Sequence, residues 1–148
     1  MSAGVFADSS ALVKLYADEH GPADVRQHSH LVVSQLARVE VPAALWRKHR
    51  MGEVTASDAG VLVADFEADY FGDGTEPPRF SVIAVSTNIL DSAARLAGVH
   101  GLRAYDAVQL ASALAAANAV PEGIAFLAYD NALNAAAAAE GLTSAIEH

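Results

Sequence analysis

The sequence predicts an α/β fold in which helices cover both faces of a central parallel sheet. Its strand-like runs are short and continuously apolar, which is typical of strands buried on both faces. Segments with the apolar spacing of helices separate these runs, and strands that alternate with helices form parallel sheets. No linker, repeat or run of charges divides the chain, so we expect one domain over residues 1–148.

The first strand and helix are expected at the N-terminus. Val5–Ala7 has the character of a short buried strand. Ser9 or Ser10 can cap a helix that runs to about Ala17, because a serine oxygen accepts a hydrogen bond from a free N–H of the first turn. A Gly-Pro pair then breaks the helix, and a short helical piece to about Gln27 follows.

The second strand, Leu31–Val33, is followed by two expected helices. Ser34 is expected to cap the first of them, which ends near Arg50. The internal Pro42 predicts a kink in this helix, because proline removes a backbone donor. The next helix begins with Thr55–Asp58, which has the spacing of a capping box.

The middle of the chain contains the third strand and the next helix. Asp-Gly and Pro-Pro pairs mark a loop, and Val82–Val85 is the expected strand after it. Ser86 can cap the following helix, and we expect Gly98–Gly101 to interrupt it.

The C-terminal third completes the alternation of helix and strand. A strongly apolar helix is expected over about Arg103–Asn118, the fourth strand over Ile124–Ala128 and an alanine-rich helix over Asn131–Ala139. Ser144–Ile146 is either a short last strand or a frayed tail.

The composition excludes several classes of protein. With 53% hydrophobic residues, the chain can bury a substantial core and is too apolar to be disordered. The absence of cysteine excludes disulfides and thiolate metal sites, and it fits a reducing, cytoplasmic location. No run approaches the ~18 apolar residues of a membrane span. The N-terminus lacks the basic start of a secretory signal, so we expect no membrane association.

The net charge of −9 argues against a protein that grips nucleic acid by bulk electrostatics. It permits a metal site or a local basic patch. Arg47-Lys48-His49-Arg50 is the only basic cluster. Arg47, Lys48 and Arg50 are therefore candidates for contacts with the phosphates of a nucleic acid, although cations also favour a helix C-terminus for structural reasons.

Two of the 18 acidic residues follow expected strands. Asp8 comes after the first strand and Asp130 after the fourth. Ligands of open α/β sheets bind outside the carboxyl ends of the strands, so neighbouring strands would place both carboxylates in one crevice. Taken alone, each acid could equally be the cap of the next helix.

Two further acids lie on expected helices. Glu40 has Ala43 and Ala44 among its helical neighbours, which places its carboxylate beside the apolar stripe. A salt bridge, for example with Arg47, is the alternative explanation. Asp106 lies in the first turn of an apolar helix, where an acid also interacts favourably with the helix dipole.

Four clustered carboxylates would repel each other, and some would stay protonated without a counter-charge. A hard divalent cation removes this repulsion. Oxygen ligands without cysteine or a convincing histidine cluster indicate Mg²⁺ or Mn²⁺ rather than Zn²⁺. A metal held in this way can activate water and stabilise charge on a phosphodiester.

Four segments of the chain resemble the PIN-domain family, specifically the VapC-type toxins of bacterial toxin–antitoxin pairs. They are FADSSALVKLY, ARVEVPAALWR, LRAYDAVQLASAL and FLAYDNALNAAAAAEGL, in family order. The resemblance implies a three-layer α/β/α sandwich with about five parallel strands. It also implies a metal-dependent endoribonuclease with an RNA substrate, a small cognate antitoxin and a homodimeric state.

The resemblance places the family's acidic site on Asp8, Glu40, Asp106 and Asp130. It implies that Asp8 and Asp106 bind the metal directly. Glu40 would hold a metal-bound water or a second ion, and Asp130 would complete the site. Three polar residues could assist by orienting acids or touching phosphate, although each is also typical of a cap or turn: Ser9, Ser34 and Asn131. Three aromatic residues are expected to pack rather than stack on bases: Trp46, Tyr105 and Tyr129.

Other classes fit the sequence less well. A haloacid-dehalogenase-like phosphatase would need an acid where Ser10 stands, and a receiver domain would need paired acids before the first strand and a lysine after a late strand. No phosphate-binding glycine motif occurs, so nucleotide binding has no support from a motif. The remaining alternative is a non-catalytic PIN-like module that binds RNA or protein. Retention of acids at all four positions favours catalysis over this module.

Overall fold

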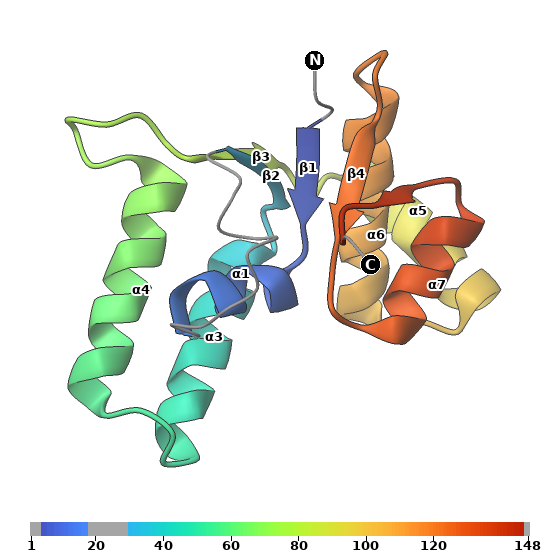
Figure 1. Ribbon diagram of the computed structural model, residues 1–148. Coiled ribbons are helices and arrows are strands. Elements are labelled where there is room, and N and C mark those ends of the chain that lie inside the picture. Colours follow the sequence, from blue (N-terminus) through green and yellow to red (C-terminus); the bar gives the residue numbers. More distant parts are fainter. Residues whose placement is uncertain (1–3, 18–29, 147–148) are drawn as a thin grey trace.

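A five-stranded parallel sheet lies between two layers of helices in the computed structural model, which describes residues 4–17 and 30–146 (Figure 1). The predicted three-layer α/β/α fold is confirmed. The helical piece expected to end near Gln27 lies outside the described residues. No helix in the described part of the chain is long and apolar enough to cross a membrane.

The sheet has the order β3-β2-β1-β4-β5. Its strands are β1 (Gly4–Ala7), β2 (Leu31–Ser34), β3 (Phe80–Ile83), β4 (Ile124–Leu127) and β5 (Thr143–Ser144). The central strand β1 pairs Phe6 with Val32 on one side and with Phe126 on the other. The chain builds outward through β2 and β3, then returns to build β4 and β5 on the opposite side. The order therefore reverses between β1 and β4, where ligand sites of open α/β sheets form.

The six described helices divide equally between the two faces (Figure 1). One layer consists of α1 (Ser9–Ala17), α3 (Ala37–Arg50) and α4 (Ala56–Phe71). The other consists of α5 (Thr87–His100), α6 (Ala104–Asn118) and α7 (Asn131–Ala139). Because successive side chains of a strand point to opposite faces, each strand contributes to both cores.

The two cores are visible in the alternation along β1. Val5 and Ala7 join the core under α1, α3 and α4, where Phe66 is fully buried. Phe6 faces the other layer and stacks on Phe126 with ring centroids 5.9 Å apart. The residues of β1 are continuously apolar because the strand packs against helices on both faces of the sheet, as the sequence predicted.

Both edge strands differ from their expected positions. β3 begins two residues earlier than Val82–Val85, because the buried Phe80 anchors it against β2 while Val82 is partly exposed at the edge. β5 contains only Thr143–Ser144 and not Ser144–Ile146. Edge strands bury less of their surface, so their apolar pattern is weaker than that of central strands.

Helix ends were predicted well where a side chain caps them. Thr55 accepts a hydrogen bond from Asp58 N at 3.0 Å, and Ser86 accepts one from Ile89 N at 3.3 Å. Ser34 was wrongly predicted as a cap: it ends β2, and α3 begins three residues later without a side-chain cap. Gly98 does not interrupt α5, which ends instead at a left-handed Gly101.

Candidate active site

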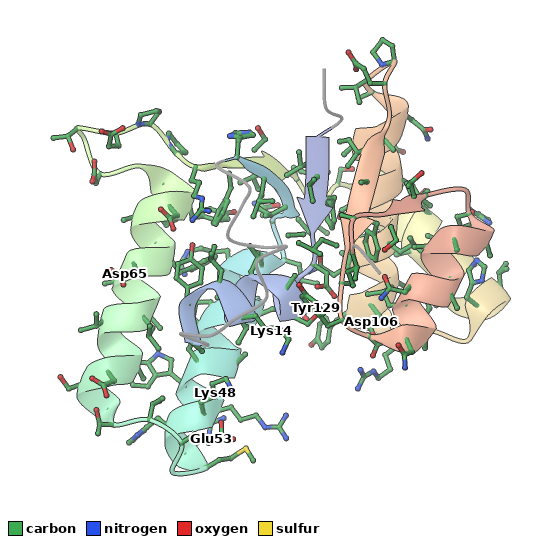
Figure 2. All side chains as sticks on the ribbon, viewed as in Figure 1. Lys14, Lys48, Glu53, Asp65, Asp106 and Tyr129 are labelled. Carbon is green, nitrogen blue, oxygen red and sulfur yellow. The ribbon has the colours of Figure 1, made fainter. Side chains whose placement is uncertain are left out.

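The four predicted acids lie around the carboxyl ends of the central strands. Asp8 follows β1, and Asp130 follows β4. The two strands are neighbours in the sheet, which is the condition under which both acids were predicted to face one crevice. The backbone N–H of Asp8 donates to the carbonyl of Leu127 at 3.1 Å, which locks the end of β1 against β4. Glu40 and Asp106 lie in the first turns of α3 and α6. Figure 2 shows Asp106 at this end of the sheet.

Asp8 is almost completely buried, with 4% of its surface exposed. Its Oδ1 accepts hydrogen bonds from Ser10 Oγ at 2.7 Å and Ala11 N at 2.9 Å. The capping explanation is therefore correct for this oxygen. Within the described part of the chain, nothing donates to Oδ2, so one carboxylate oxygen stays available to a ligand.

The electrostatics of Asp8 link it to two of the other acids. Burial raises the pKa of Asp8 to about 6, although the hydrogen bonds from Ala11 and Ser10 oppose this rise. The negative charges of Asp106 and Glu40 raise the pKa further. Asp106 and Glu40 are therefore each close enough to Asp8 to disfavour its charged form.

Glu40 is held by two donors from distant parts of the chain. Its Oε1 accepts hydrogen bonds from Ser9 Oγ at 2.9 Å and from Gln109 Nε2 at 2.8 Å. Ser9 thus orients an acid, as expected. No ion pair joins Glu40 to Arg47 among the described residues, so the salt-bridge explanation is wrong.

Gln109 is the residue that sequence reasoning missed. It is 2% exposed, and its Nε2 also donates to Ser9 Oγ at 2.9 Å. Within the described residues its Oε1 is buried without a hydrogen-bond partner. The available signal was an amide on the apolar face of a helix, three residues after Asp106, since such a group needs a polar partner when buried.

Asp106 and Asp130 have weaker local restraints. Asp106 Oδ2 pairs with Nε of Arg103 at 3.3 Å, but the Arg103 side chain is 83% exposed and such pairs contribute little. Asp130 caps α7 by accepting from Leu133 N at 2.8 Å. No described contact joins Asp130 to the other three acids, so the structure places it at the same sheet edge without bringing it into their cluster.

Ser34 and Asn131 do not reach the acids in the described structure. Ser34 Oγ accepts hydrogen bonds from Leu36 N and Ser112 Oγ, both at 3.1 Å. Asn131 is exposed at the start of α7. The expectation that Ser34 orients an acid is therefore wrong, because Ser34 is buried at the end of β2 and contacts Ser112 of α6.

The chemistry of the acidic donors fits a hard divalent cation. Burial is the main cause of the raised pKa of Asp8, and the charges of Asp106 and Glu40 add to it; a bound cation would offset both effects. In residues 4–17 and 30–146, however, no three acidic or histidine side chains converge as a preformed metal cage. The carboxylates are instead directed toward Ser9, Ser10, Gln109 and Arg103.

A pocket of about 400 Å³ lies between α3 and the start of α6 with Glu40 in its lining, and we refer to it as the α3–α6 pocket. Its lining includes Glu40, Ala43, Ala44, Arg47 and Arg50 of α3 and Tyr105 of α6. Tyr105 is 64% exposed, so the expectation that it packs inside the protein is wrong. The α3–α6 pocket therefore combines an acid, two arginines and an aromatic ring.

The predicted basic cluster is divided between two sides of α3. Arg47 and Arg50 line the α3–α6 pocket, whereas Lys48 lines a separate pocket with Lys14 and Ser10. Lys48 also pairs with Glu53 at 3.4 Å; both residues are labelled in Figure 2.

The two other aromatic residues differ from Tyr105. Tyr129 is half-buried beneath Lys14, whose Nζ lies 5.4 Å from the ring centroid. Trp46 is 38% exposed and lies edge-on to His49.

Comparison with known proteins identifies similar sequences and a similar fold. Ribonuclease VapC45 and Ribonuclease VapC49, from two strains of Mycobacterium tuberculosis, are each 34% identical over 143 residues. Each match covers 93% of this chain and 91% of the relative. The crystal structure of PAE2754 from Pyrobaculum aerophilum matches with a TM-score of 0.64 and 24% identity, covering 97% of this chain and 84% of that one. No protein-family model matches the chain.

Proposed function

This chain belongs to the VapC family of PIN-domain ribonucleases, and from that premise we propose that it hydrolyses phosphodiester bonds in RNA with Mg²⁺ or Mn²⁺. The observation that supports this proposal best is the interaction of Asp8 with Asp106 and Glu40 at the reversal point of the sheet. A buried acid with like-charged neighbours is a common feature of catalytic sites. In this family context it is a candidate site for cation-assisted hydrolysis.

Asp8 and Asp106 would hold the cation, with Glu40 beside them and Asp130 completing the site. The cation, when bound, supplies a Lewis acid that offsets the negative charge developing on the phosphate. Ser10 and Ala11 fix one oxygen of Asp8 and leave the other free of described donors. Ser9 and Gln109 fix Oε1 of Glu40, so its second oxygen can accept a proton from an attacking water.

The same premise extends to the partners. We propose that the protein is a toxin, silenced by a small cognate antitoxin whose tail brings a basic side chain to the acids. We also propose a homodimer in the cytoplasm. The excess of acids over bases supports the basic tail, and the lack of cysteine supports a reducing compartment. Sedimentation equilibrium of the purified protein tests the dimer directly.

Incubation of the purified protein with total cellular RNA tests the activity. New RNA ends should appear with Mg²⁺ or Mn²⁺, disappear in excess chelator and return when the metal is restored. Cleavage that continues in chelator would contradict the metal requirement. RNA that is bound but never cut would identify the non-catalytic PIN-like module instead.

Induction in cells tests the toxin proposal separately. Expression of this chain alone should arrest growth, and co-expression of a small reading frame adjacent to its gene should restore growth. Normal growth despite accumulation of the folded protein would contradict a role as a toxin.

A further inference from the structure

The two arginines of the α3–α6 pocket have no acidic partner among the described residues. Arg47 and Arg50 are exposed, and neither forms an ion pair within the described part of the chain. Nearby cations differ: Arg38 pairs with Glu67 at 2.7 Å and Lys48 with Glu53 at 3.4 Å. Arginines left unpaired in an acidic protein can bind an anion, and their planar donors suit phosphate oxygens.

Tyr105 lies across the same pocket with most of its ring exposed. Its exposed fraction is 64%, and no described aromatic or cationic group contacts the ring. Exposed aromatic side chains beside cations are a common platform for unpaired bases, because every base presents a flat face to stack. Bases inside a duplex cannot reach such a ring.

The arginines of the pocket lie some distance from the acids, so the pocket would hold a nucleotide beside the one that is cut. Tyr105 directly precedes Asp106 in the first turn of α6. Arg47 lies seven residues beyond Glu40, which is about 10 Å along the helix axis. Ala43 and Ala44 line the pocket between Glu40 and Arg47, and their small side chains leave space there. A phosphate at the arginines is therefore separate from a phosphate at the acids.

We propose that the α3–α6 pocket binds an unpaired nucleotide next to the RNA bond that is cut. The base stacks on Tyr105, and a flanking phosphate contacts Arg47 and Arg50. This subsite rests on the proposed ribonuclease function and names the residues that would hold the substrate beside Glu40. The arginines favour RNA over the basic tail of an antitoxin, because like charges repel.

Binding of a labelled single-stranded RNA oligonucleotide in chelator tests the subsite without requiring cleavage. Tyr105→Ala should weaken binding roughly tenfold, and Tyr105→Phe, which keeps the ring, should retain it. Arg47→Gln should weaken binding and reduce the slope of log K against log salt by about 0.7. Arg95→Gln is the matched control, since it removes an arginine charge from α5, outside the α3–α6 pocket. A fully paired RNA should not distinguish Tyr105→Ala from wild type.

Several outcomes would overturn the subsite. They are wild-type protein that does not bind single-stranded RNA, Tyr105→Ala that binds it normally, or Arg95→Gln that loses as much affinity as Arg47→Gln. Loss of affinity only for a co-purified antitoxin would assign the pocket to that protein instead. If the oligonucleotide binds as predicted but RNA is never cut with metal, the ribonuclease proposal fails while the binding subsite stands. If Tyr105→Ala cuts and binds RNA normally, only the subsite fails.

Discussion

Nε2 of Gln109 lies 2.8 Å from Oε1 of Glu40 and donates a hydrogen bond to it. This contact joins α6 to α3 between residues 69 positions apart in the chain. The amide orientation follows from the charge of its partner, because only the NH₂ group can face a carboxylate favourably. The buried, unpartnered Oε1 of Gln109 in the described structure is the consequence of that orientation.

Replacing Gln109 by Leu should lower RNA cleavage about 10- to 100-fold, because residues that orient the groups around a metal commonly have effects of this size. Unfolding free energy should change by only about 1–2 kcal/mol, since the substitution removes an unpaired buried oxygen together with two hydrogen bonds. Cleavage kinetics and chemical denaturation measure the two effects.

Ser112→Ala is the matched control for this prediction. Ser112 is fully buried three residues further along α6 and contacts Ser34 and the Val108 carbonyl rather than an acid. It should lose about 1 kcal/mol of stability and no activity. Equal loss of activity in both variants would show that Gln109 acts only through packing.

Asp8 should make the stability of the metal-free protein depend on pH. Its pKa rises from 3.8 in the unfolded chain to about 6 in the folded protein, so the folded state binds the proton more tightly. The resulting stabilisation is fully present below about pH 4 and is lost as the pH rises through about 6. The loss is at most roughly 3 kcal/mol.

Denaturation of wild type and Asp8→Asn in chelator across this range measures the effect. Asparagine keeps the oxygen that accepts from Ser10 and Ala11 but does not ionise, so the variant should not show this loss. Because other titrating groups are common to both proteins, the difference between the two curves isolates Asp8. Parallel curves from pH 4 to pH 7 would refute the prediction.

Tyr16→Phe should destabilise the fold without changing cleavage. The Tyr16 hydroxyl donates to Oδ2 of Asp69 at 2.6 Å and connects α1 to α4. Burial and the Asp69 carboxylate hold the pKa of Tyr16 well above its usual range, so the phenol remains a donor at all ordinary pH values. Losing a hydrogen bond to a charged group costs about 1.5–3 kcal/mol, measurable by urea denaturation. A variant as stable as wild type would exclude this role.

The N-terminal cap of α4 should contribute to stability independently of the site. Thr55→Ala removes the acceptor for Asp58 N and should cost about 1 kcal/mol, whereas Thr55→Ser should retain most of it. Thermal unfolding measures both variants. Because Thr55 does not contact the acids, RNA cleavage by Thr55→Ala at a temperature where it is folded should equal that of wild type. Reduced cleavage by the folded variant would contradict this separation.

Several features could be predicted from sequence because they depend on local pattern. Apolar runs identified the central strands, and serine or threonine before an apolar helix identified the caps at Thr55 and Ser86. The parallel sheet made Asp8 and Asp130 neighbours at one edge once β1 paired with β4. The three-layer fold therefore followed from the order of the segments.

Other features depend on contacts between distant segments. An amide on an apolar helix face was a signal for Gln109, but its partner could not be identified because Ser9 is 100 residues away. Tyr105 was misassigned because it lies at the start of a strongly apolar helix, while its exposure depends on how α6 meets α3. Asp130 was expected to join the other acids, yet a capping hydrogen bond to Leu133 uses one of its oxygens. These outcomes are decided by tertiary packing, which local periodicity does not encode.

The rate of RNA cleavage by Asp8→Asn in Mg²⁺ or Mn²⁺ tests the central claim most directly. Asparagine preserves the size of the side chain and the hydrogen bonds to Ser10 and Ala11, so circular dichroism should show an intact fold. Thr55→Ala, which contacts none of the acids, serves as the folded comparison. We predict that Asp8→Asn does not cut RNA while the comparison variant cuts it at the wild-type rate. Cleavage by Asp8→Asn at the wild-type rate would contradict the assignment of the acids as a metal-dependent ribonuclease site.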